Sequence, residues 1–326
     1  MLKGFRCPPH GEDPGRNNSY EYCFYKCSNR CMPKAMLSKF AEQHADNVHR
    51  GDMITPSALK GCTRKLVLER TTDYYAEPPR LYYAVRGSLI HGFLENQSLE
   101  GVHTEKRLFK KIKALGREFV ISGQIDMYDE REQVIEDYKT ASDKAFYFLF
   151  DTGAKEEHIL QTNTYRWLCD GGHLGSLDGP QVNWPVKRII LNYLLMNQVI
   201  STGRTHVERV TGYKEPNMGK KYRLEKSRKK VGKNHRGTPI WEIQLDIPEV
   251  PLMSEGDIFK HIELNGLKTL QGFKVMESGS MPEGVLYDRD GAWQCGYCDV
   301  VSTCQDYERR ANPEKFKQYI QLKQVE

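Results

Sequence analysis

Two neighbouring segments with alternating apolar residues constrain the fold of this chain more than any other feature. Apolar and polar residues alternate over residues 118–127, and a second such segment, 133–140, follows the sequence DERE. A period of two with a short turn between the segments predicts a β-hairpin. Asp137 and Lys139 are two residues apart and project from one face, on which Asp126 of the neighbouring strand can converge. The hairpin is therefore expected to bring two carboxylates and a lysine together.

This combination of side chains suits a hard divalent cation. Mg²⁺ prefers oxygen ligands and keeps several waters, and a lysine beside it can orient or deprotonate an attacking water, as phosphodiester hydrolysis requires. Taken alone, charged residues at alternate strand positions usually form only a solvated face. Glu136 is expected to point away from Asp137, so Asp137 is the preferred ligand. Glu105 is interpreted as a surface strand residue rather than an auxiliary acid.

Other segments carry helix and strand signals. A helix is predicted to begin with Thr55 as N-cap and Pro56 at its first position, placing Cys62 on an inward face. Further helices are predicted over residues 83–95 and 156–170, and one begins at Ser254 with Asp257 completing a capping box. An apolar run covers residues 188–196, and the alternating segment over 241–247 is interpreted as a strand.

The acidic hairpin lies within an ordered series of motifs. His91 occurs upstream, in RGSLIHGFLE. The acids and the lysine follow in SGQID and VIEDYKTA, and QTNTY lies downstream of them. Over roughly residues 55–305, this series resembles the PD-(D/E)XK nucleases of the RecB-like branch. The resemblance implies an α/β fold with a central mixed sheet flanked by helices. The alternative is a buried structural histidine beside surface acids.

The same resemblance implies a role for each matching residue. His91, Asp126 and Asp137, with the backbone carbonyl of Tyr138, would bind Mg²⁺ or Mn²⁺, and Lys139 would assist the water. The helix that contains Gln161 and Tyr165 would lie beside the site and contact DNA. The implied activity is that of a metal-dependent deoxyribonuclease, which is expected to act as an exonuclease in recombination, repair, viral genome processing or CRISPR adaptation.

Three cysteines near the end of the chain form a C-x₂-C-x₅-C arrangement, at Cys295, Cys298 and Cys304. Thiolates at this density bind zinc or an iron–sulfur cluster, and either normally has four ligands. Cys62, upstream of the nuclease motifs, is the candidate for the fourth. One upstream and three downstream cysteines resemble the Cas-four and AddB-type nucleases, which implies a four-iron, four-sulfur cluster, with zinc as the alternative.

Four more cysteines occupy the first 50 residues, which are expected to form a separate module before a nuclease domain over 51–326. Cys7, Cys23, Cys27 and Cys31 lie in a segment with little apolar periodicity, so a structural zinc site is predicted. His10 could replace Cys7, and the alternative is a set of free thiols in a flexible leader. The ninth cysteine, Cys169, is predicted to be a small buried residue.

A basic segment over residues 214–236 contains ten Lys or Arg and two Glu. Its excess of positive charge is larger than the net charge of +5 for all 326 residues. It is expected to be a flexible loop that binds DNA phosphates, with the cations Lys226, Arg228, Lys229 and Lys230 proposed as contacts. The alternative is a solvated loop without a ligand.

Composition narrows the remaining classes. With 39% hydrophobic and 28% charged residues and no run of roughly 18 apolar residues, the sequence predicts a cytoplasmic globular protein, encoded by a cell or a virus, without a membrane partner. DNA single strands or ends are the expected substrate, and a helicase, recombination or CRISPR adaptation protein is a candidate partner. The rival hypotheses are a non-catalytic iron–sulfur DNA-binding scaffold and an electron carrier.

Overall fold

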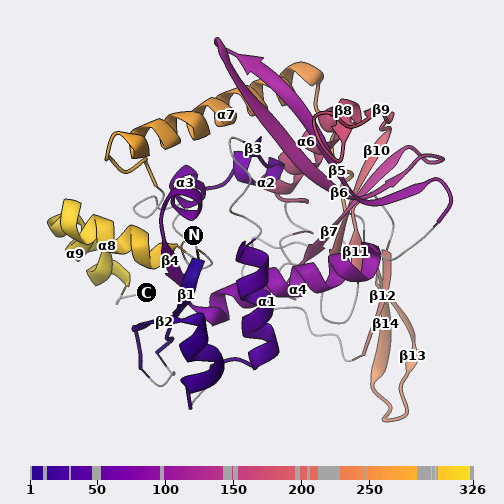
Figure 1. The fold of residues 1–326 in the computed structure, drawn as a ribbon. Coiled ribbons are helices and arrows are strands. Elements are labelled where there is room, and N and C mark those ends of the chain that lie inside the picture. The colour runs from indigo at the N-terminus through magenta and orange to yellow at the C-terminus, as the bar shows by residue number, and fades with distance from the viewer. Residues whose placement is uncertain are drawn as a thin grey trace.

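The fold is that of a computed structural model. It describes residues 2–9, 13–28, 31–45, 53–95, 99–141, 149, 153–194, 199–203, 206–211, 228–245, 247–284, 295, 298 and 300–323. Within these residues, a mixed sheet of eight strands forms the centre of the molecule (Figure 1). Helices flank this sheet, so the predicted mixed α/β architecture is confirmed at that level.

The order of the strands places the predicted hairpin in the middle of the sheet. The order is β11 (Val199–Ser201), β10 (Arg188–Leu194), β7 (Val134–Thr140), β6 (Arg117–Asp129), β5 (Val102–Ala114), β8 (Asp170–Leu174) and β9 (Gln181–Asn183), with β3 (Met53–Ile54) paired to β6. The β10–β7 and β3–β6 pairs are parallel, whereas β5, β6 and β7 are antiparallel neighbours. The sheet is therefore mixed, with β6 at its centre.

Two tight turns set the register of these three strands. Leu115 and Gly116 join β5 to β6 with φ angles of 47° and 74°, as a two-residue hairpin turn of the primed type requires. Between β6 and β7, Oδ1 of Asp129 accepts hydrogen bonds from the backbone N–H groups of Arg131 and Glu132. The hairpin predicted from residues 118–140 is confirmed.

The main apolar core lies between the sheet and the helices α2 (Pro56–Leu59), α6 (Glu156–Cys169) and α7 (Glu255–Glu277). Ile121 and Ile125 of β6 are fully buried in it, as is Ile262 of α7. The predicted cap of α7 is confirmed, since Oγ of Ser254 accepts the backbone N–H of Asp257. Cys169 is also fully buried in this core, as the sequence predicted.

The helix predicted after Thr55 is interrupted. Thr55 and Pro56 do occupy the N-cap and the first position of α2, but α2 ends at Leu59. A second helix, α3 (Thr63–Thr71), begins after Cys62, which is its N-cap. The prediction that Cys62 lies on an inward helix face is therefore wrong. The chain leaves the helix at Lys60 and Gly61, because glycine is a poor helix former.

The N-terminal segment belongs to a second core that it shares with later elements. It contains β1 (Leu2–Arg6), β2 (Asn17–Ser19), a π-helix η1 (Tyr22–Lys26) and α1 (Lys34–Ala45). β1 pairs in parallel with β4 (Tyr74–Ala76), and Phe5 and Phe40 are buried with Val85 of α4 (Pro78–Glu95) and Val300. α8 (Val301–Ala311) and α9 (Pro313–Lys323) lie on the same side of the molecule (Figure 1). The expected boundary near residue 50 therefore does not separate two independent cores.

A small antiparallel sheet extends from the body of the molecule (Figure 1), with strands in the order β12 (His206–Thr211), β14 (Pro239–Leu245) and β13 (Arg228–Lys233). β13 comes from the predicted basic loop, so a loop over all of 214–236 is wrong for residues 228–233, which pair with β14. Residues 214–227 lie outside the described part of the chain. Among the described helices, none has the length and apolar character needed to span a membrane.

Candidate functional site

Three acidic residues lie in one row across the centre of the sheet. The β5–β6 register pairs Thr104 with Met127, so the next residue of β5, Glu105, lies opposite Asp126. One residue beyond the last β6–β7 pair, the same row reaches Asp137. Glu105 has a φ of 51°, which residues other than glycine rarely adopt, so the strand is distorted at this acid. Neighbouring strands thus place three carboxylates together.

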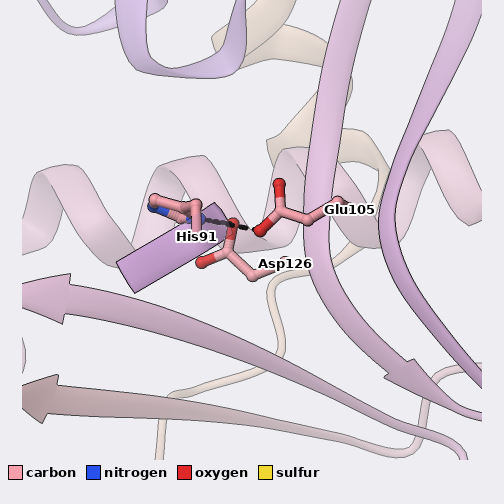
Figure 2. A group of neighbouring side chains, drawn as sticks. All are labelled: His91, Glu105 and Asp126. Carbon is pink, nitrogen blue, oxygen red and sulfur yellow. Dashed lines mark hydrogen bonds and ion pairs between the residues drawn. The ribbon is translucent and has the colours of Figure 1, made fainter. Parts of the chain in front are cut away.

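A histidine from α4 completes this group (Figure 2). His91 Nδ1 donates a hydrogen bond to Oε1 of Glu105 at 2.8 Å and lies 3.4 Å from Oδ1 of Asp126. One ligand atom from each of these three residues lies within 4.8 Å of the other two, a spacing at which a single metal ion can be held. The Glu105 and Asp126 side chains are only 5% and 7% exposed, whereas His91 is 36% exposed. The group therefore opens to solvent on its histidine side.

Glu105 is held by a chain of polar contacts. Gln124 Nε2 donates to Oε2 of Glu105 at 2.6 Å, and its own Oε1 accepts a hydrogen bond from Arg107 at 2.6 Å. Arg107 also contacts Ser122 Oγ at 3.3 Å. The Arg107–Gln124–Glu105 chain fixes the carboxylate toward His91, which is the arrangement expected of groups that orient a metal ligand. The prediction that Glu105 is a surface residue is wrong.

Asp126, Asp137 and Lys139 meet on the other side of the group. Oδ2 of Asp126 accepts the backbone N–H of Tyr138 at 2.7 Å, which ties β6 to β7 beyond their last paired residues. Lys139 Nζ donates to Oδ1 of Asp137 at 3.0 Å. It also lies 2.7 Å from Oδ2 of Asp137, but this buried oxygen receives no aligned hydrogen bond from any described residue. A buried carboxylate oxygen that accepts no hydrogen bond is a suitable ligand for a cation.

The crowding of acids changes their protonation. Burial, followed by the charge of Asp137, raises the pKa of Asp126 to about 7, although His91, Lys139 and the N–H of Tyr138 oppose this. The hydrogen bond to Glu105 raises the pKa of His91 against the opposing effect of burial. Acids that repel one another in a buried place favour a bound cation, which compensates their charge.

Glu136 and Asp137 diverge as the strand alternation predicted. Oε2 of Glu136 accepts hydrogen bonds from Asn192 at 2.6 Å and from the Tyr138 hydroxyl at 3.2 Å. Glu136 is therefore engaged away from the row of three carboxylates, and Asp137 is the acid of β7 that faces Lys139.

The helix that follows the hairpin packs against β6 through a glycine. A Cβ added at Gly123 would lie 2.7 Å from Leu168 and 2.8 Å from the Tyr165 ring, so only glycine allows this close approach. Tyr165 is 6% exposed, and its hydroxyl accepts a hydrogen bond from Gln161 at 2.7 Å. The expectation that Tyr165 contacts DNA does not fit this burial, whereas Gln161 remains half-buried beside it.

Replacing Gly123 by alanine is expected to lower the free energy of unfolding by about 1–3 kcal/mol, because the new methyl group overpacks the β6–α6 contact. Chemical denaturation measures this change. Gly87→Ala is the matched control, since a Cβ at Gly87 of α4 meets nothing within 4 Å and alanine favours helices. Equal stability of the Gly123→Ala variant and the unmodified protein would contradict the packing argument.

The structure brings the C-terminal cysteines toward Cys62. Arg64, the second residue of α3, donates to Sγ of Cys304 at 3.4 Å and forms a buried ion pair with Glu308 of α8 at 2.6 Å. Burial raises the pKa of the Cys304 thiol, Arg64 opposes this effect, and the charge of Cys62 adds to it. Cys298 and Cys304 pack against the second core, and the Cys298 N–H donates to the Cys295 carbonyl at 3.4 Å. α3 and α8 are thus joined beside these cysteines.

The remaining predicted residues are placed as follows. Cys7, Cys23, Cys27 and Cys31 line one cavity in the N-terminal segment. Lys230 and Lys233 are exposed on β13, which also contains Arg228 and Lys229. Lys226 and His10 lie outside the described residues.

Comparisons with known proteins leave the family open. No family model matches the chain, and no curated protein matches it. A solved structure titled "Crystal structure of SSO0001" aligns with a TM-score of 0.43 and 17% identity, covering 82% of this chain and 92% of that one. Similarity this low carries no argument about function.

Proposed function

We propose that this protein is a divalent-metal-dependent nuclease that hydrolyses phosphodiester bonds in DNA. The observation that carries the proposal is the convergence of His91, Glu105 and Asp126 beside the Asp137–Lys139 pair. A structural salt-bridge network could explain Lys139 with one acid, but it does not require three buried acids in one row with a single lysine and a half-exposed histidine. These residues fit a hard cation through their oxygen and imidazole ligands.

The residues of this site are proposed to have two roles, which are to bind the metal and to position the attacking water. His91, Glu105, Asp126 and Asp137 would hold Mg²⁺ or Mn²⁺, with the Tyr138 carbonyl as a further proposed ligand. Such an ion would supply Lewis-acid chemistry for the phosphate and the attacking water. Lys139 Nζ, fixed by Asp137, would hold that water for attack. The water oxygen forms a bond to phosphorus, the bond to the leaving oxygen breaks, and a proton passes to that oxygen.

A four-iron, four-sulfur cluster is proposed at Cys62, Cys295, Cys298 and Cys304. The donor set fits, because four soft thiolates satisfy such a cluster and Arg64 already donates to one of the sulfurs. The cluster would hold the start of α3 against the segment before α8. Its proposed function is to fix the two ends of the nuclease region relative to each other.

The DNA surface is proposed to include the small sheet. Lys230 and Lys233 are exposed there, and the described part of the basic segment 214–236 begins with Arg228. Cations on an extended strand can follow a phosphate backbone without reading bases. Gln161 of α6 is proposed as a second contact, close to the metal-binding residues through Tyr165.

Replacing Lys230 and Lys233 together by alanine is expected to weaken DNA binding equally for all sequences. Each lost phosphate contact should reduce the slope of log K against log[salt] by about 1. Fluorescence anisotropy at several salt concentrations measures this slope. The control replaces Lys315 and Lys317, two exposed lysines of α9, which removes the same charge elsewhere. An equal effect of both double variants would mean that net charge, not this strand, binds DNA.

The deciding experiment incubates the purified protein with end-labelled single-stranded and double-stranded DNA. Cleavage is expected with Mg²⁺ or Mn²⁺ and not in the presence of EDTA. The position of the labelled products distinguishes digestion from an end from internal cleavage. Binding without cleavage under every metal and substrate condition would favour the alternative of a non-catalytic DNA-binding scaffold.

A further inference from the structure

The N-terminal segment contains a second cluster of thiols that the proposed nuclease site does not use. Cys7 directly follows β1, Cys23 lies within η1, Cys27 is the C-cap of η1, and Cys31 precedes α1. Although they span 25 positions of the sequence, all four line one cavity, together with the apolar side chains of Phe5 and others. The fold has therefore gathered four soft ligands from separate parts of the segment.

The backbone around the cavity supports this gathering. The Cys7 N–H donates to the Arg16 carbonyl, and the Gly15 N–H donates to the Cys7 carbonyl, both at 2.8 Å, which closes the loop after β1. The Cys27 N–H donates to the Tyr22 carbonyl at 2.9 Å and so ends η1 with Cys27 beside the cavity. The positions of these two cysteines follow from hydrogen bonds and not from the apolar core alone.

One backbone N–H group already donates to a sulfur of this cluster. The backbone N–H of Asp13 donates to Sγ of Cys7 at 3.3 Å. N–H donors around sulfur are a common feature of thiolate metal sites.

We propose that Cys7, Cys23, Cys27 and Cys31 bind one structural Zn²⁺ ion. Four thiolates complete a closed tetrahedral site, which leaves no position for a substrate. The ion would bind the loop after β1 to η1 and to the start of α1, next to the second core. This inference goes beyond the proposed nuclease function and does not depend on it.

The described structure also predicts what zinc would change. Among the described residues, only His91, Glu105 and Asp126 bring three candidate ligand atoms within 4.8 Å of one another. No three of the four sulfurs are therefore this close, as they would be around a bound zinc ion. Zn–S bonds of about 2.3 Å place tetrahedral sulfurs about 3.8 Å apart. Zinc should therefore draw the cavity together, and binding should protect the four thiols from reagents.

The test measures zinc, iron and acid-labile sulfide in the unmodified protein and in three variants. Cys23→Ser and Cys27→Ser are each expected to lose about one zinc ion per chain and to retain the iron of the unmodified protein. Cys62→Ser should do the reverse, losing iron and retaining zinc. Unchanged zinc in both N-terminal variants would overturn the proposal, and loss of iron and sulfide from them would assign a cluster to this site instead.

A measurement on the unmodified protein avoids variants that fail to fold. Zinc-loaded and chelator-treated samples are alkylated, and the modified cysteines are identified by mass spectrometry. Cys7, Cys23, Cys27 and Cys31 should each react at least several-fold faster after zinc is removed, whereas the buried Cys169 should not change. Equal alkylation of the four cysteines in the two samples would overturn the proposal.

Discussion

Asp126→Asn is expected to reduce metal-dependent DNA cleavage on the order of 10³-fold or more, because the amide keeps the shape but removes a buried anionic ligand. Asp137→Asn and Lys139→Ala should have effects of similar size, since these residues act as one unit. Initial rates with end-labelled DNA at saturating Mn²⁺ measure the loss. Full cleavage by all three variants would reject the proposed nuclease site.

The same variant should separate function from folding. Because burial raises the pKa of Asp126 to about 7, the folded state binds this proton more tightly than the unfolded state. The carboxyl's contribution to stability therefore falls as pH rises from about 4 to 7. In metal-free protein at pH 8, Asp126→Asn should be no less stable than the unmodified protein. Added Mn²⁺ should raise the melting temperature of the unmodified protein only.

Glu105 and Glu136 provide a matched pair of acids on neighbouring parts of the sheet. Glu105→Gln is expected to lower cleavage at least about tenfold, because it removes the carboxylate that Gln124 directs toward His91. Glu136→Gln should cleave at the unmodified rate, since Glu136 contacts Asn192 and Tyr138 instead. Normal cleavage by Glu105→Gln beside an inactive Asp126→Asn would remove Glu105 from the ligand set.

Cys62→Ala and Cys304→Ala are expected to lose the iron and sulfide of anaerobically purified protein, together with its brown colour. The cluster would close a loop of more than 230 residues between Cys62 and Cys295. Its loss should therefore lower the free energy of unfolding on the order of 5 kcal/mol by chain entropy alone. Iron and sulfide assays, visible absorption and denaturation measure these effects, with about four iron atoms per chain expected before substitution.

Cys169→Ala is the control for the loss of a cysteine as such. Cys169 is fully buried in the main core, so this variant should lose some stability and retain all of its iron. Colourless protein that holds zinc through Cys62, Cys295, Cys298 and Cys304 would contradict the cluster assignment.

Local sequence signals identified the elements that short-range physics determines. Ser254 and Asp257 marked the start of α7, because a cap depends on residues three apart. Alternation over residues 118–140 predicted the hairpin and the opposite directions of Asp137 and Glu136, since side chains alternate in any strand. The burial of Cys169 agrees with the prediction that a free cysteine behaves as a small apolar residue.

Glu105 shows why other parts of the site required the tertiary structure. Its position opposite Asp126 depends on the β5–β6 register, which the two-residue turn at Leu115 and Gly116 sets, and its contact with His91 depends on how α4 packs. The shared core of Phe5 and Val300 likewise joins residues almost 300 positions apart. Local sequence determined the secondary structure and the candidate acids, whereas strand register and long-range packing decided which side chains meet, because those contacts depend on the whole chain.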